Sequence, residues 1–526
     1  MTKSSKICSF VNFIWKSFLD SRVYAFLERI VCYFADAYGK SKTREILVGK
    51  KDIEDDAGKS KVYGALSKAW SAFLGRSKSF FGFFEKNADG SLIKKLYFSF
   101  FKNGLRENAV YMTSFLCMII FAVPHQFWAN PFGLAFAVLL ILIYAISASG
   151  TKSEILPGKD VKGVWLCMLA FGFCLVASTF ISYDIVDSVR VLTFFITSYT
   201  LCFALYAAIR SEKGLDVVTG FMYAVLQFMS AIAVIQRILG IEADASLTDL
   251  ELNKDMPGRV FSTLGNPNNF AEFLVLFMPF ALAFALNRKK GAKRNACLFG
   301  MLLPLAAILL TYSRSGWIAL AIAAVIFVYL YDKRLVPVFV ILALAAIPVM
   351  PKHVLARILT IGNMKDSSSS YRLDIWSGCV KMLKDYWYTG VGLGTGGFAE
   401  IYPPYAVGTS GVAPHSHMHF MEMLVELGAA GFVSYVAMTF TIIKRSFISS
   451  SRRVSEKTRN VAVASASAMT GIVMIGCFEY CWFYPRVMFA FFVCAGIAMA
   501  AIRLAKNNTE DYRGKQRQTE KTKMEN

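Results

Sequence analysis

Three of the five histidines of this chain lie close together, in the run Pro414-His415-Ser416-His417-Met418-His419. The ordinary pKa of histidine lets this side chain exchange a proton near neutral pH, so such a cluster is typical of acid–base chemistry. The run ends a long polar stretch, and a block of apolar residues follows it directly. The alternative interpretation is that these histidines are only polar residues at the start of a helix.

A metal site is a second interpretation of the cluster. Glu422 and Glu426 follow at helical spacing from His415 and His419, and these residue types bind zinc. However, a helix that begins within the run would turn His417 away from the other two histidines. No residues that would orient such ligands stand out in the sequence. We therefore expect no metal and no cofactor.

Arginines stand at or near the ends of several apolar blocks and could bind an anion beside the histidines. The four candidates are Arg190, Arg259, Arg314 and Arg372. The guanidinium fork matches the oxygens of a phosphate group, so several arginines on one face favour recognition of phosphate. The alternative for any one of them is a salt bridge to Asp374, Glu272 or Glu422, or a side chain that extends to the lipid headgroups.

The elements that must position these residues are membrane-spanning helices. The chain has 526 residues, of which 56% are hydrophobic, and the apolar residues form long blocks separated by short charged links. This pattern predicts an all-α polytopic membrane protein, because a helix needs about 20 apolar residues to cross a bilayer. The alternation typical of a membrane β-barrel is absent. About twelve spans are expected, near residues 108–127, 130–150, 161–182, 188–209, 214–240, 266–286, 296–312, 314–331, 335–351, 419–443, 461–480 and 485–505.

The charged links predict the orientation of these spans. Lys and Arg gather in the links 287–295, 332–334 and 444–459 and in the C-terminal tail, whereas the link 241–257 is acidic. Positive links face the cytoplasm, so both termini are expected there. Lys352–Ser416 then becomes one large external loop between spans 9 and 10. The net charge of +21 is explained by the membrane and needs no nucleic acid.

Three regions follow from this pattern. Residues 1–106 form a basic cytoplasmic segment, in which Ala69–Phe101 mixes aromatic and basic residues and suits an amphipathic helix on the inner membrane face. A poorly ordered tail is the alternative for this segment. Residues 107–505 form the transmembrane domain, whose external loop covers residues 352–418, and residues 506–526 form a basic cytoplasmic tail.

Three local patterns predict further details of the structure. A helix is expected over Arg372–Leu383, because apolar residues recur there at helical spacing; they are Leu373, Trp376, Val380 and Leu383. Gly390–Gly397 is rich in glycine but lacks the Lys-Ser/Thr of a phosphate-binding loop. It is expected to be a flexible or close-packed turn. Gly428-Ala429-Ala430-Gly431 predicts close helix packing.

Three stretches, in this order, resemble the O-antigen ligase and polymerase family of bacterial membrane glycosyltransferases. They are Ser313-Arg314-Ser315-Gly316-Trp317, then Arg372-Leu373-Asp374-Ile375-Trp376 with the later Gly390-Val391-Gly392-Leu393-Gly394, and finally His415-Ser416-His417. The Gly265-Asn266-Pro267-Asn268 turn is a weaker match. Met418 stands where the family usually has asparagine. The resemblance covers roughly residues 160–500.

The resemblance implies that the protein transfers a preassembled glycan from undecaprenyl diphosphate to an acceptor hydroxyl, outside the bacterial cytoplasmic (inner) membrane and without a metal. It assigns acceptor activation to His417 and diphosphate binding to Arg314 and Arg372, with Arg259 as a further donor-binding candidate. Secondary candidates are Arg190, Asp374, His415, His419 and Glu422. The implied partners are the lipid-linked donor, a glycan or lipid-glycan acceptor and the bilayer.

Competing functions remain open from the sequence. The acceptor could be a different molecule, as for a ligase, or another glycan on the same carrier, as for a polymerase. A transporter or flippase would place ionisable residues near the bilayer midplane and show two similar halves. The charged candidates lie instead at the expected external ends of spans, and the sequence shows no two similar halves. A non-catalytic assembly partner would tolerate loss of His417 and the arginines.

Overall fold

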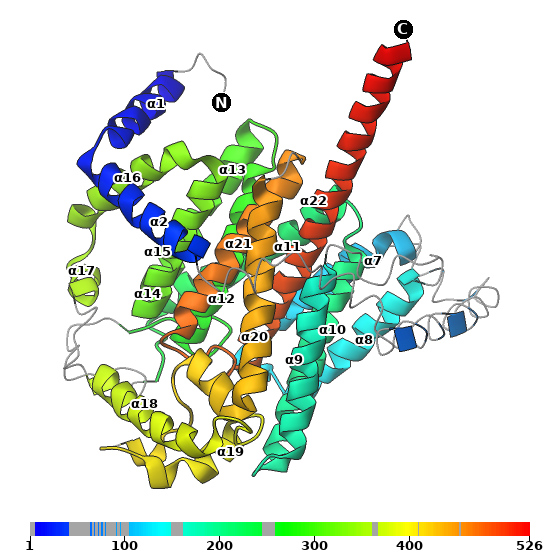
Figure 1. Ribbon diagram of the computed structural model, residues 1–526. Helices are drawn as coiled ribbons and strands as arrows, with labels where there is room; N and C mark the ends of the chain where they lie inside the picture. The colour runs from blue at the N-terminus through cyan, green and yellow to red at the C-terminus, as the bar shows by residue number, and fades with distance from the viewer. Residues whose placement is uncertain are drawn as a thin grey trace.

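The computed structural model describes residues 6–40, a few positions between 64 and 95, and residues 105–148, 161–244, 258–359, 367–408, 410–451 and 454–525. These residues form helices, and none of them belongs to a strand, as the sequence predicts. Most of the amphipathic stretch expected at 69–101 lies outside the described residues. Figure 1 shows the long helices as one bundle.

Each of the twelve expected spans corresponds to helical structure. The helices are α7 (Leu105–Ala122), α8 (Asn130–Ala148), α9 (Lys162–Phe180), α10 (Ile185–Ala208), α11 (Glu212–Leu239), α12 (Pro267–Leu286), α13 (Ala292–Gly300), α14 (Leu302–Leu310), α15 (Arg314–Asp332), α16 (Val336–Ala346), α20 (His419–Ser451), α21 (Glu456–Gly476) and α22 (Pro485–Glu525). Among the described residues, eight helical stretches are long and apolar enough to cross a membrane, and one of them joins α15 to α16. A multi-pass helical protein is therefore confirmed, whereas the number of twelve spans stays a prediction.

Helix α21 is one expected span that lies outside these eight, and its position in the bundle explains its composition. It packs against α12, α15, α20 and α22. Its small polar residues are buried, and the hydroxyl of Ser467 donates to the carbonyl of Ala323 at 2.6 Å. Because other helices cover α21, it needs little lipid-facing apolar surface, and small residues let its neighbours approach closely.

Helix α20 is broken at Gly428, where the backbone has φ 65° and ψ −173°. Few residues other than glycine adopt this conformation. The glycine-rich loop packs against the break: Val391 N–H donates to the Val425 carbonyl at 2.8 Å, and Gly394 N–H donates to Glu426 Oε2 at 2.9 Å. The loop is thus the close-packed turn that the sequence allowed. The Gly428 patch is a helix break as well as a packing surface.

The expected external loop contains α17 (Lys352–Leu359), α18 (Ser367–Tyr386), α19 (Thr395–Ile401) and the short helices η5 (Pro403–Tyr405) and η6 (Ser410–Val412). Helix α18 confirms the helix predicted there. Ile375, Cys379 and Met382 are fully buried, whereas Val380 is 54% exposed. The helix buries its Ile375–Met382 side against the loop and α20, and of the apolar residues that predicted the helix Leu383 packs against this cluster.

Helices α18 and α19 lie at the opposite end of the bundle from the C-terminal end of α22, as Figure 1 shows. This arrangement agrees with a loop and a tail on opposite sides of the membrane. Near the chain start are α1 (Lys6–Leu19) and α2 (Arg22–Lys40). Helix α1 contacts α16, and Arg334 donates to Asn12 Oδ1 at 3.1 Å.

Candidate active site

Arg259 is the most buried arginine among those predicted to bind the donor. It lies in the segment before α12 and is 6% exposed. Its Nε donates to the carbonyl of Thr311 at 2.8 Å, and its Nη2 donates to Asn268 Oδ1 at 2.5 Å. Asn268 is in the first turn of α12, whose N-cap Asn266 accepts a hydrogen bond from the Asn268 N–H. The predicted Gly265–Asn268 turn therefore positions this guanidinium.

Glu479 joins the predicted arginines from a different part of the chain. It lies in the link between α21 and α22, and its side chain is 12% exposed. Arg372 of α18 donates through Nη2 to Glu479 Oε1 at 2.6 Å, and Asn268 Nδ2 donates to the same oxygen at 3.3 Å. The carboxylate thus connects α18 to the start of α12. The acid that pairs with Arg372 is none of the three proposed from the sequence.

The electrostatics show that four guanidinium groups share one region. The pKa of Arg259 is lowered to about 10, first because the side chain is buried and then because Arg357 repels its charge. Arg314 and Arg372 act in the same direction, while Glu479 opposes them. Three guanidiniums and the carboxylate of Glu479 act on Arg259, so the region favours an anion with several oxygens, such as a diphosphate.

Arg357 was not predicted from the sequence. It lies on the short helix α17, and its Nε donates to the carbonyl of Tyr312 at 3.4 Å. That carbonyl belongs to the turn that leads into α15, so Arg357 and Arg314 lie at the same turn. A basic residue on the predicted external side, close after an expected span, was the available signal, since such residues run against the usual charge bias.

The histidine run forms a tightly held turn before α20. Glu422 Oε2 accepts the Ser416 N–H at 2.6 Å, and Trp376 of α18 donates its indole N–H to the Ser416 carbonyl at 2.9 Å. His417 itself has φ 53°, in the left-handed region. Glu422 is fully buried, so it acts as an anchor for this turn. Two α18 residues, Trp376 and Arg372, therefore connect the histidine turn to the arginine cluster.

His417 lies beside His415, and the charge of Arg372 acts on it. Its ring centroid is 4.1 Å from that of His415 and 6.3 Å from that of Tyr371. Burial lowers the pKa of His417 below 6.5; the charge of Glu479 raises this pKa, and the charge of Arg372 lowers it. The imidazole is therefore neutral at pH 7 and able to accept a proton.

The three histidines are arranged differently from the prediction. Helix α20 begins only at His419, so the helical rotation that would separate His417 from His415 does not occur. The Nδ1 atom of His415 accepts the His417 N–H at 3.1 Å. His419 is instead buried among aromatic rings, 4.5 Å from Trp482 and 5.0 Å from Tyr435 between centroids. His419 therefore belongs to the packing of the bundle.

Two secondary candidates lie elsewhere in the structure. Arg190 is paired with Asp187 and its side chain is 58% exposed. Asp187 accepts the Gly396 N–H at 2.9 Å, so this pair holds the glycine-rich loop. Asp374 approaches the backbone of Gly408, in the segment that follows η5. Within the described parts of the chain, no group of three or more His, Cys, Asp or Glu side chains could hold a metal ion.

Three non-glycine residues among those described have a left-handed backbone, and all lie in segments that carry the site. They are Ser262, Tyr312 and His417, with φ of 52°, 50° and 53°. Ser262 separates Arg259 from Asn268, and Tyr312 precedes Arg314 by two residues. Such conformations cost free energy and gather at functional sites. They support the interpretation of this region as a site.

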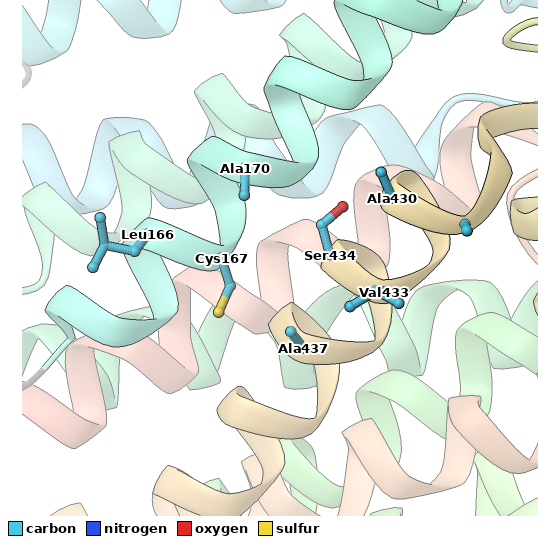
Figure 2. A pocket seen from close by; sticks show the side chains of 8 residues that line it. Leu166, Cys167, Ala170, Ala430, Val433, Ser434 and Ala437 are labelled. Atoms are coloured by element: carbon cyan, nitrogen blue, oxygen red, sulfur yellow. The ribbon is translucent and has the colours of Figure 1, made fainter. Parts of the chain in front are cut away.

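A separate apolar hollow of about 560 Å³ lies between α9 and α20. Figure 2 shows Leu166, Cys167 and Ala170 of α9 facing Ala430, Val433, Ser434 and Ala437 of α20. None of the residues that line it is charged. The hollow is therefore not the place where the arginines and His417 act.

Residues 299–436 match the model of the O-antigen ligase family. The match contains Arg314, Arg357, Arg372 and His417, but not Glu479. No curated protein matches the chain. The resemblance that the motifs predict is thus confirmed over this range, and it supports glycan transfer of the O-antigen ligase or polymerase type by a multi-pass membrane protein.

Proposed function

We propose that the protein transfers a glycan from undecaprenyl diphosphate to an acceptor hydroxyl on the external side of the bacterial cytoplasmic membrane. The observation that carries the proposal is that the charges of Arg314, Arg357 and Arg372 act on buried Arg259, while Arg372 and the Glu479 paired with it act on His417. This combination supplies an anion site and a proton acceptor, which are the two groups that the transfer needs.

The chemistry follows from the donor. The acceptor hydroxyl oxygen attacks the anomeric carbon of the first sugar, and the bond from that carbon to the diphosphate oxygen breaks. The electron pair leaves with undecaprenyl diphosphate, and the hydroxyl proton moves to the imidazole of His417. The arginines stabilise the charge that develops on the leaving diphosphate. His417 is neutral before the reaction, as a proton acceptor must be.

The segment from α17 to the histidine turn contributes several side chains to the candidate site. Arg357, Arg372 and Trp376 all come from this segment, and the last two reach Glu479 and Ser416. A loop that holds donor-binding groups can close over a lipid-linked substrate and exclude water, which would otherwise compete with the acceptor hydroxyl. We infer that the predicted external loop has this role.

Ligase and polymerase share this chemistry and differ in the acceptor. Deleting the gene separates them. A ligase-type strain should lose surface glycan and accumulate long lipid-linked chains, whereas a polymerase-type strain should keep single repeats. In both cases the accumulated donor should be on the outer face of the membrane, where an added glycosidase can digest it. Accumulation on the cytoplasmic face would indicate a flippase, and unchanged surface glycan would contradict the proposal.

A further inference from the structure

Glu479 is the acidic residue at the centre of the arginine cluster, and neither the motifs nor the family match includes it. Two side-chain donors meet the same carboxylate oxygen: Arg372 Nη2 lies 2.6 Å and Asn268 Nδ2 3.3 Å from Oε1. Asn268 in turn accepts from Arg259 at 2.5 Å. One carboxylate oxygen thereby aligns two donor-binding arginines, one directly and one through an amide.

The charge of Glu479 matters because its surroundings are positive. The charges of Arg314, Arg357 and Arg372 act on the buried guanidinium of Arg259, and burial of like charges without a counter-ion is costly. Glu479 reduces that repulsion while no donor is bound. A diphosphate would supply the same compensation and would compete with Glu479 for Arg372. The carboxylate therefore weakens donor binding to some degree.

The same carboxylate opposes the arginines at His417. The groups that face His417 are Tyr371 and Arg372 of α18, His415 of the same turn, and Glu479 of the α21–α22 link. Among the described residues, Glu479 is the one carboxylate whose charge acts on His417. When His417 takes a proton it becomes a cation beside Arg372, and the carboxylate of Glu479 then offers an opposite charge.

We propose that Glu479 is a positioning residue for glycan transfer, which aligns Arg372 and Asn268 and stabilises the protonated His417 that forms during the reaction. This inference rests on the proposed function. Glu479 then has two opposite effects. Its charge favours the transfer of the acceptor's proton to His417, and it competes with the donor diphosphate for Arg372. A residue that only supported the fold would have neither effect.

Glu479→Gln separates charge from geometry, because the amide oxygen can accept both hydrogen bonds that Oε1 accepts now. We expect kcat to fall about tenfold, as for a loss of roughly one pKa unit in favourable interaction with protonated His417. The KM for the lipid-linked donor should fall, because the site becomes more positive. Without Glu479 the pKa of His417 is lower, so the neutral base survives to lower pH. The acid limb of the kcat profile should therefore move to lower pH.

The matched control is Glu400→Gln on α19, which removes one acidic charge from an exposed position. It should leave kcat, KM and the pH profile unchanged. Glu479→Asp keeps the charge but places it one methylene farther from Arg372. Its kcat, its KM for the donor and its acid limb should therefore change in the same directions as in Glu479→Gln, by smaller amounts. If the Gln variant does not fold, the Asp variant decides the question alone.

The inference is overturned if folded Glu479 variants raise the KM for the donor or leave the acid limb in place. That outcome does not touch the proposed function as long as the wild-type protein transfers glycan and His417→Ala does not. If the wild-type protein transfers no glycan, or His417→Ala is fully active, the proposed function fails first. The two failures are therefore distinguishable in one set of assays.

Discussion

Arg372→Lys is a sharp test of donor recognition, because it keeps the charge and removes the fork. In the structure one guanidinium nitrogen of Arg372 contacts Glu479 at 2.6 Å, which leaves the other nitrogens of the planar group to meet a phosphate. A lysine ammonium is a single point and cannot contact both in the same geometry. A hydrogen bond to a charged group contributes about 1.5–3 kcal/mol. Its loss corresponds to a decrease of about 10- to 150-fold in kcat/KM, at 1.36 kcal/mol per tenfold.

The assay is transfer from an undecaprenyl-diphosphate glycan by purified protein, with the donor concentration varied. The loss should appear in kcat/KM for the donor, and Arg314→Lys should behave in the same way. Arg190→Lys is the matched control, because Arg190 is paired with Asp187 and lies apart from the cluster. If the Arg314 and Arg372 lysine variants both transfer glycan at the wild-type rate, these arginines are structural and the assignment of the donor site is refuted.

The remaining predictions concern topology and the helix break. In an otherwise cysteine-free protein, Val412→Cys should react with a membrane-impermeant thiol reagent in cells with an intact cytoplasmic membrane, because Val412 is 91% exposed on the predicted external loop. Lys290→Cys should react only after the membrane is opened, and the reverse pattern would contradict the orientation; buried Cys379 is unsuitable as a probe. Gly428→Ala should lower stability by about 1–3 kcal/mol, because its backbone conformation is strained for other residues. The Gly428→Ala protein should melt at a lower temperature than the control Gly411→Ala, where an added methyl meets no atom within 4 Å. Equal melting temperatures would contradict the role of the break.

The sequence predicted the helical membrane class and several of the residues that meet at the candidate site. Apolar blocks of the length of a bilayer identify spans, and arginines on the side that normally lacks them stand out. Arg259, Arg314 and Arg372 were found in this way, and the structure brings their charges together. His417 followed from the histidine run and lies at the same cluster.

Other parts of the site depend on tertiary contacts that leave little trace in the sequence. Glu479 is a single acid at the end of a span, and only its proximity to Arg372 shows what it does. A useful signal was available, since an excess of arginines at one membrane face calls for a counter-ion there. The pairing of the His415 and His417 rings could not be predicted, because it depends on the left-handed backbone of His417 and on the start of α20 at His419.

The buried face of α18 also could not be predicted from the sequence. Leu373 and Val380 helped to predict the helix and are 37% and 54% exposed, while Ile375 and Cys379 are buried. Apolar residues therefore occur on more than one face of α18, and the face of Ile375 and Cys379 packs on the protein. Periodicity identifies such a helix but does not say which apolar face meets the protein.

The central claim is that His417 accepts the proton of the acceptor hydroxyl. The direct measurement is glycan transfer in vitro by the wild-type protein, His417→Ala and the control Arg190→Lys, which lies apart from the cluster, each with and without a metal chelator. A positioned histidine contributes about 10²–10⁴-fold, so His417→Ala should lose transfer by a factor in this range while its melting temperature stays near that of the wild type. Arg190→Lys and the chelator should have no effect. Full activity of folded His417→Ala would contradict the account.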